Sequence, residues 1–300
     1  MDKIENFRLE LLEFLKNRYK LKKGGIQSEI SNLDFYFSNE LTEFNSTLYE
    51  PSICIILQGS KAVSFADELY SYSSEDYLLS SSHFPACVKL LEASEETPYI
   101  SFRIRFDMQD IYDVIKKIDT QKLILNAKTE KALYFDKLNE NLYEPIVRLI
   151  KLLNRPKEDI EFLTPIMTKE ILYVLINERS GYFLNKFALE GTVSNKIAKI
   201  ISEIKNNYNE KLNIKELAKI VDMSESSLYK NFKIITSLSP LQLQKKIRLE
   251  EAKLMLVNQN VEVAEVAFNV GYESASQFSR EYLRMFGMSP KAHAEFLKSN

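Results

Sequence analysis

The 300-residue chain contains no tryptophan, two cysteines, two histidines and seven glycines. Cys54 and Cys87 are too few for a disulfide framework or a four-ligand cysteine zinc site. His83 and His293 do not supply the clustered histidines of a metal-dependent cupin enzyme, and no nucleophile–histidine–acid set can be built from them. The glycines form no phosphate-binding loop. We therefore expect no metal, no cofactor and no catalytic activity.

Long apolar segments are also lacking. The longest uncharged run, Tyr77 to Val88, has twelve residues and includes three serines and a proline. A membrane-spanning helix needs about 20 mostly apolar residues. The N-terminus is charged from Asp2 onward and lacks the apolar core of a signal peptide. We expect a cytoplasmic protein that does not contact a membrane.

The first third of the chain has the pattern of one helix followed by short strands. Ile4 to Tyr19 carries apolar residues at helical spacing, and the Gly24-Gly25 pair breaks the pattern. Short apolar runs separated by turn residues then favour an antiparallel barrel or sandwich. The expected strands are Leu33–Phe37, Ser52–Leu57, Lys61–Phe65, Leu69–Tyr72, Tyr77–Ser80, Val88–Glu92 and Tyr99–Phe106.

Two features of this region are candidate effector or sensor groups. Arg103 and Arg105 share one face of the expected strand Tyr99–Phe106 and would either grip an anionic effector inside the barrel or form a polar, solvent-facing surface. Cys54 is expected to be a small buried side chain within a strand. Cys87 follows Pro85 in an expected loop, and with Lys89 nearby it is a candidate redox-sensing thiol, with simple burial as the alternative.

Helical periodicity replaces strand alternation from Met108 onward. Ile111–Ile118, Leu142–Leu153 and Ile160–Ile176 carry apolar residues at three- and four-residue steps. We predict an α+β fold in three parts: an N-terminal helix with an antiparallel β-barrel or sandwich (1–107), a helical dimerisation or connecting region (108–190) and an all-α C-terminal domain (191–300). The apolar stripes between Asn141 and Ile176 are the basis for expecting a homodimer.

The C-terminal part contains an internal repeat. Residues 214–221 match residues 263–270 at a constant offset of 49, and Ser224 to Pro240 matches Ser274 to Pro290 at an offset of 50. Capping-box patterns mark expected helix starts at Asn213, Ser239 and Ser274. Each copy is predicted to be a short helix, a tight turn and a second helix. The two copies are therefore two helix-turn-helix units.

The outer face of each second helix follows from a rotation of 100° per residue. If Leu228 and Phe232 face the core in the first unit, and Phe278 and Tyr282 in the second, the outward residues lie in a major groove. We expect base contacts from Ser226, Tyr229, Lys230, Ser276, Ser279 and Arg280, with Lys233 and Arg284 on phosphates. Gln277 points sideways and is expected to cap its helix.

This C-terminal pattern resembles the AraC/XylS family of bacterial transcription regulators from about Val193 to Lys291. The strongest block is VGYESASQFSREYLRMFGMSP, which ends at Pro290. The chain departs from the family at Ser237, where glycine is usual, and at Leu243, where an aromatic is usual. The resemblance implies a linker helix at about Pro240–Leu256 and two recognition helices, about 224–236 and 274–286, in adjacent major grooves about 34 Å apart.

Three shorter segments resemble the cupin-like, effector-binding N-terminal region of one branch of that family: Ile55–Lys61, Tyr77–Ser80 and Ala93–Tyr99. The resemblance implies an effector-responsive transcription regulator. Its partners would be double-stranded promoter DNA, a small-molecule effector, a second copy of the chain and, for an activator, RNA polymerase. A cupin-like enzyme with a DNA-targeting domain is one alternative, and a constitutive dimeric DNA-binding protein without an effector is another.

The net charge supports this division of the chain. The whole sequence has a formal charge of −2, which by itself argues against nucleic-acid binding. Residues 191–300, however, carry 16 Lys or Arg and 12 Asp or Glu, while residues 1–190 carry 24 and 30. An acidic N-terminal part and a mildly basic C-terminal part are thus averaged in the total. The modest +4 predicts few phosphate contacts and a shallow salt dependence of DNA binding.

Overall fold

The computed structural model describes residues 3–19, 23–66, 68–118, 131–189, 191–258 and 262–299. The strands are β1 (Gly24–Gln27), β2 (Leu33–Ser38), β3 (Asn45–Tyr49), β4 (Ser52–Gln58), β5 (Ser60–Phe65), β6 (Glu68–Tyr72), β7 (Asp76–Ser80), β8 (Phe84–Glu92), β9 (Tyr99–Arg105) and β10 (Leu133–Lys137). The helices are α1 (Lys3–Arg18), α2 (Met108–Ile115), α3 (Glu140–Lys151), α4 (Lys157–Asn177), α5 (Gly181–Ala188), α6 (Val193–Asn206), α7 (Ile214–Ile220), α8 (Glu225–Thr236), α9 (Pro240–Asn258), α10 (Val263–Asn269), α11 (Ala275–Phe286) and α12 (Pro290–Ser299).

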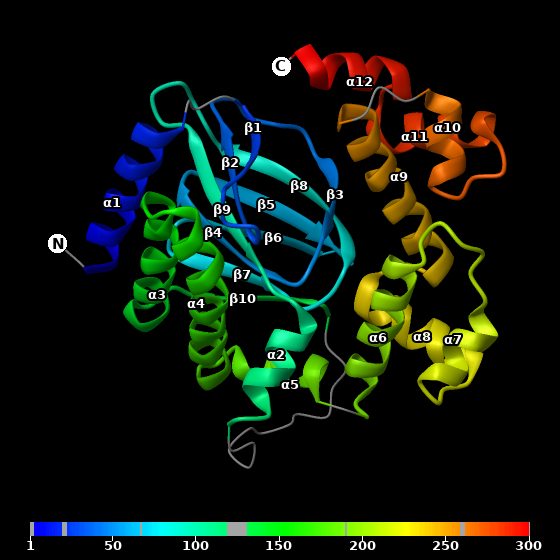
Figure 1. Cartoon of the computed structure of the whole chain (residues 1–300), viewed down its shortest axis with the longest axis horizontal. Helices are drawn as coiled ribbons and strands as arrows, with labels where there is room; N and C mark the ends of the chain where they lie inside the picture. Colours follow the sequence, from blue (N-terminus) through cyan, green and yellow to red (C-terminus); the bar gives the residue numbers. More distant parts are fainter. Residues whose placement is uncertain are drawn as a thin grey trace.

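Two antiparallel sheets form the N-terminal barrel (Figure 1). One sheet has six strands in the order β1-β2-β9-β4-β7-β10, and the other has four in the order β3-β8-β5-β6. Buried aromatic side chains pack against one another on the four-stranded sheet: the centroid of the Phe84 ring lies 5.2 Å from that of Tyr49 and 4.5 Å from that of Phe65. The α+β class and the antiparallel N-terminal domain are confirmed.

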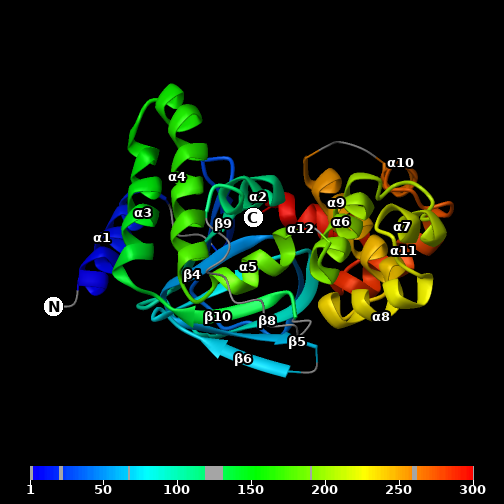
Figure 2. The same cartoon turned by 90° about the horizontal axis from the view of Figure 1, so that it is seen from below.

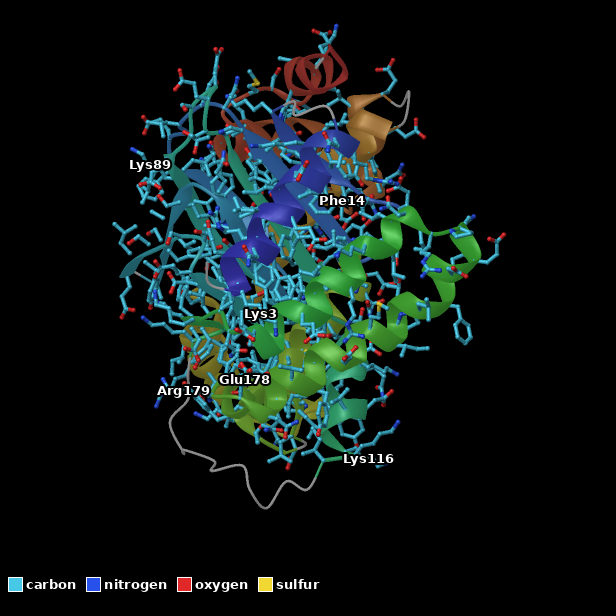
Figure 3. All side chains as sticks on the ribbon, turned by 90° about the vertical axis from the view of Figure 1, so that its left-hand side faces the viewer. Lys3, Phe14, Lys89, Lys116, Glu178 and Arg179 are labelled. Carbon is cyan, nitrogen blue, oxygen red and sulfur yellow. The ribbon has the colours of Figure 1, made fainter. Side chains whose placement is uncertain are left out.

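A layer of helices covers the outer face of the six-stranded sheet. Figure 3 shows α1, α3 and α4 lying across this face. Phe35 and Phe37 of β2 pack there against Tyr19, and Arg8 of α1 donates to the Leu57 carbonyl of β4 at 2.7 Å. Both faces of this sheet are therefore covered, and β9 does not present a face to bulk solvent. The interpretation of Arg103 and Arg105 as a polar, solvent-facing surface is wrong.

Three strands were not expected from the sequence: β1, β3 and β10. The helical spacing of residues 4–19 and the seven expected strands are present, with shifted ends. The strand expected at Val88 begins four residues earlier, at Phe84. Cys87 therefore lies within β8, opposite Ser46 of β3 and Ser64 of β5, and its assignment to a loop is wrong.

The C-terminal helices lie on the side of the barrel away from α1, α3 and α4 (Figures 1 and 2). The first helix-turn-helix, α7 and α8, shares one continuous hydrophobic core with the barrel. The second, α10 and α11, packs into a separate core with the end of α9 and includes Phe278 and Tyr282. The two units of the repeat therefore have different relations to the N-terminal domain.

The helix caps follow the sequence signals closely. Ser224 and Ser274 accept from the backbone N–H groups of Ser227 and Gln277, as N-cap side chains do. At Ser239 the capping box is reciprocal, since the Ser239 N–H also donates to the Gln242 side chain at 2.9 Å. The Gln277 amide instead donates to Glu281, so its expected capping role is wrong.

Candidate DNA-binding surface and effector cavities

The helix α8 places its expected base-reading residues on the solvent side. Leu228 and Phe232 are fully buried, which fixes the rotation of the helix. Ser226, Tyr229 and Lys230 are exposed, and Lys233 is exposed one turn further on. Neither lysine forms an ion pair with another residue that the structure describes. The face therefore presents two available positive charges, an aromatic ring and a hydroxyl.

The helix α11 presents a comparable face. Phe278 and Tyr282 are fully buried, while Ser276, Arg280 and Arg284 are exposed. Ser279 is partly covered, and its hydroxyl donates to the Ala275 carbonyl at 2.9 Å. This internal hydrogen bond leaves Ser279 less free to contact a base than Ser276.

The helix α9 connects the two units. Arg248 donates to the Tyr208 carbonyl at 2.6 Å and to the carbonyls of Gly271 and Glu210 at 2.8 Å each. Gln244 donates to two of the same carbonyls. One guanidinium thus ties the end of the first unit's supporting helix to the turn of the second unit. No sequence motif predicts these contacts, because the acceptors are backbone atoms.

Ser237 ends α8 in the left-handed conformation, with φ of 61° and ψ of 8°. Gly287 occupies the corresponding place after α11, with φ of 73°. Ser237 is therefore the left-handed residue that caps the C-terminal end of α8, a position at which glycine is preferred. Leu243, the other departure from the family pattern, is fully buried.

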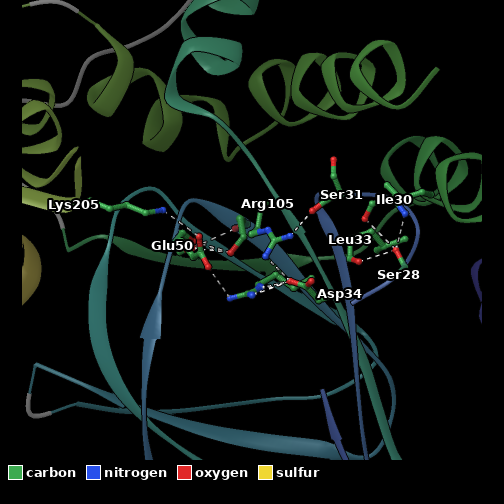
Figure 4. Close-up of polar contacts among 11 residues, drawn as sticks. Ser28, Ile30, Ser31, Leu33, Asp34, Glu50, Arg105 and Lys205 are labelled. Atoms are coloured by element: carbon green, nitrogen blue, oxygen red, sulfur yellow. Dashed lines mark hydrogen bonds and ion pairs between the residues drawn. The ribbon is translucent and has the colours of Figure 1, made fainter. Parts of the chain in front are cut away.

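Arg103 and Arg105 are part of an ionic network at the end of the barrel (Figure 4). Arg103 contacts Asp34 at 2.8 Å and Glu50 at 3.5 Å, and Arg105 contacts Asp34 at 3.1 Å. Glu50 also contacts Lys205 of α6 at 3.7 Å. The network therefore runs from the barrel to the first helix of the C-terminal region.

A cavity of 440 Å³ opens inside the barrel, and Arg103 and Lys61 line it. The Lys61 ammonium lies 5.9 Å from the Tyr49 ring and 5.4 Å from the Tyr72 ring, and burial lowers its pKa. The helix α9 reaches this cavity through Lys253. Arg105 does not line it, so the two arginines expected to act together face different spaces.

A larger cavity of 820 Å³ lies at the junction of three regions, and we name it the junction cavity. It is bounded by the β1–β2, β3–β4 and β7–β8 connections of the barrel, by the end of β9 and the start of α2, and by α4 and α6. Arg105 and Lys205 line it, together with the buried His83. Burial, with the nearby charges of Lys205 and Arg103, lowers the pKa of His83 to about 3. Sequence reasoning did not identify this cavity.

The two cysteines are not paired with one another. Cys54 is buried in β4, as expected, and Cys87 is exposed on β8. Near Cys87, Lys246 of α9 donates to Ser46 at 3.3 Å.

Within the described residues there is no group of three or more His, Cys, Asp or Glu side chains arranged to hold a metal ion. In the same part of the chain, no helix is long and apolar enough to span a membrane.

Each half of the chain matches a protein-family model. A model described as the AraC-type transcriptional regulator N-terminus matches residues 29–182, just over half of the chain. A helix-turn-helix domain model matches residues 217–295. These ranges include the barrel from β2 onward, the helices α3 and α4, and both helix-turn-helix units except the first three residues of α7.

Individual relatives agree with this assignment. The lactose operon transcription activator of Staphylococcus xylosus is 22% identical over 288 residues, which cover 94% of this chain and 97% of that protein. The raffinose operon transcriptional regulatory protein of Pediococcus pentosaceus is 28% identical over 155 residues, 51% of this chain and 54% of that protein. Fatty-acid-bound ToxT of Vibrio cholerae has a similar fold, with a TM-score of 0.64 at 13% identity, covering 94% of this chain and 99% of that one.

Proposed function

The chain belongs to the AraC family of transcription regulators, with an N-terminal effector-binding domain and a helix-turn-helix DNA-binding domain, and from this premise we propose which residues read its operator. Ser226, Tyr229 and Lys230 of α8 contact bases in one major groove. Ser276 and Arg280 of α11 contact bases in the next groove, with Ser279 in a minor role. Lys233 and Arg284 contact phosphates beside these bases.

The exposed, unpaired charges on both helices carry this proposal. Arg280 and Lys230 are held outward by the buried residues one turn away, and neither charge is neutralised by a described residue. An arginine in this position can donate two hydrogen bonds to O6 and N7 of guanine, and a lysine can donate to the same acceptors. Elsewhere in the domain, Lys245 pairs with Glu281 and Arg248 donates to backbone carbonyls, so both are poor candidates for DNA contacts.

Binding to DNA tests the assignment. Genomic fragments retained by the purified full-length protein would define an operator, and fluorescence anisotropy on that operator would compare two variants. Arg280→Ala should weaken binding by about 1–3 kcal/mol and relax selectivity at one base pair. Lys233→Ala should weaken binding to all sequences alike and reduce the salt slope by about 1. If both variants bind with unchanged affinity and selectivity, the docking face is wrong.

We also propose that the effector is a carbohydrate. Relatives named for the lactose and raffinose operons support this class. Arg103 and Arg105 take part through the ionic network at the end of the barrel rather than as a joint grip on an anion, because both already pair with Asp34 and Arg103 also pairs with Glu50. We assign Cys87 no sensing role in this scheme, although its exposure keeps the thiol accessible.

A homodimer and a cytoplasmic location complete the proposal. The helix α4 exposes three large apolar side chains, Phe162, Ile166 and Tyr173, on the outside of the helical layer. A second copy of the chain is the partner proposed for this stripe. RNA polymerase is the further partner if the protein activates transcription.

A further inference from the structure

The charged groups around the junction cavity already have partners within the protein. Seven charged side chains line it, and each has a partner in the structure. Those with ion pairs are Glu29 with Arg18, Glu50 with Arg103 and Lys205, Arg105 with Asp34, Asp110 with Lys169, and Glu161 with Lys157. Asp107 instead caps α2 by accepting from the Gln109 N–H at 3.0 Å. An anionic ligand would have to compete with Asp34 and Glu50 for Arg105 and Lys205, which are the cations in the cavity lining.

The hydrogen-bonding capacity that remains is neutral. Three of the residues that line the cavity each carry a buried polar atom without a partner within the described residues: Asn32 Oδ1, His83 Nε2 and Thr164 Oγ1. His83 is more than nine-tenths buried, and its lowered pKa keeps the ring uncharged near neutral pH. Together the three groups offer an amide acceptor, a neutral imidazole nitrogen and a hydroxyl. Leaving such groups unsatisfied is costly, and because each atom lies just beneath the cavity wall, a small side-chain rotation would let it bond to a polar ligand atom.

The walls of the cavity also provide apolar surface. Phe106, Met108 and Ile160 lie among the polar groups, and the volume of 820 Å³ is within the range of small-molecule sites. A ring with hydroxyls at its edge and C–H groups on its faces matches this mixture. A fatty acid would leave the three polar atoms unsatisfied, and an anion would meet five carboxylates among the seven charged groups.

We infer that the junction cavity binds a neutral polyhydroxylated molecule, such as a di- or trisaccharide, which contacts the barrel, α4 and α6 at once. The inference deepens the proposed function by placing its carbohydrate effector outside the barrel interior. Ser202 and Asn206 bring the C-terminal region into the wall, one turn or less from Lys205. A ligand bound there would lie beside the Glu50–Lys205 ion pair, which joins the two halves of the chain.

Titration calorimetry on the full-length protein tests the inference. The probes are lactose, melibiose, raffinose and maltose, with gluconate and glucose 6-phosphate as charged counterparts. At least one neutral sugar should bind saturably, and the charged compounds should not. Thr164→Val should weaken that binding about three- to tenfold, since it removes one neutral hydrogen bond while its shape is retained. Ser202→Phe, which fills the cavity from α6, should abolish it.

Thr47→Val is the matched control, because Thr47 lines the barrel cavity and not the junction cavity. It should bind the sugar as the wild type does. The inference is overturned if no neutral sugar in the set binds, if only the charged compounds bind, or if Thr47→Val weakens binding and Thr164→Val does not. Retained operator binding in the same preparations would confine that failure to the ligand site, whereas its loss would count against the proposed function as well.

Discussion

Acidification should destabilise the protein through His83 at the junction cavity. Burial and the charges of Lys205 and Arg103 lower its pKa to about 3, compared with about 6.5 in an unfolded chain. The unfolded state therefore takes up a proton below pH 6.5 that the folded state does not accept until pH nears 3. The stabilisation is complete above pH 6.5 and is lost as pH falls, by about 1.4 kcal/mol per unit. From pH 7 to pH 5 we expect a loss of about 2 kcal/mol.

Urea denaturation of the wild type and of His83→Gln at pH 7, 6 and 5 measures this loss. The variant keeps a neutral polar side chain but cannot titrate. Between pH 7 and pH 5 its free energy of unfolding should therefore fall by about 2 kcal/mol less than that of the wild type. His293, whose pKa burial lowers as well, is present in both proteins and cancels. Carboxylates with lowered pKa values, such as Glu281, titrate below this window. Equal pH dependence in the two proteins would refute the reasoning.

Two further predictions concern the helix cap and the dimer. Ser237→Gly should raise the free energy of unfolding by about 0.5–1 kcal/mol in urea denaturation, because relief of the left-handed serine outweighs the added chain entropy; a lower stability would contradict this. Phe162→Ser combined with Ile166→Ser should give a monomer in sedimentation at micromolar concentration, with unfolding little changed since both side chains are exposed. A dimer that survives both changes would place the interface elsewhere.

The three strands absent from the sequence prediction are all edge strands. β1 and β10 lie at the two edges of the six-stranded sheet, and β3 lies at one edge of the other sheet. An edge strand pairs on one side only and stays half exposed, so apolar alternation is weak. β1 begins with the Gly24-Gly25 pair, which has the pattern of a break. The interior strands carry dense apolar runs, as in β4, and all of them were predicted, although β8 begins four residues before its expected start.

The recognition helices could be predicted because their signals are local. Ser224 and Ser274 mark the helix starts, and the buried residues Leu228 and Phe278 fix the rotation within a few positions of the outward residues. The junction cavity had no comparable signal. Its Glu50–Lys205 contact joins residues 155 positions apart. No periodicity or motif encodes such a pair, since only the folded topology brings it together.

The two hydrophobic cores determine where an effector can act on the DNA-binding domain. The first helix-turn-helix shares its core with the barrel, and the second does not. Polar contacts across the boundary also fall on α6 and on the linker helix α9, as in Glu50–Lys205 and Ser46–Lys246. A ligand shifts the arrangement only if it binds one form better than the other. A ligand at the junction cavity touches α6, which supports the first unit, and so would change how the α8 face is presented, while α11 follows only through α9 and its Arg248 contacts.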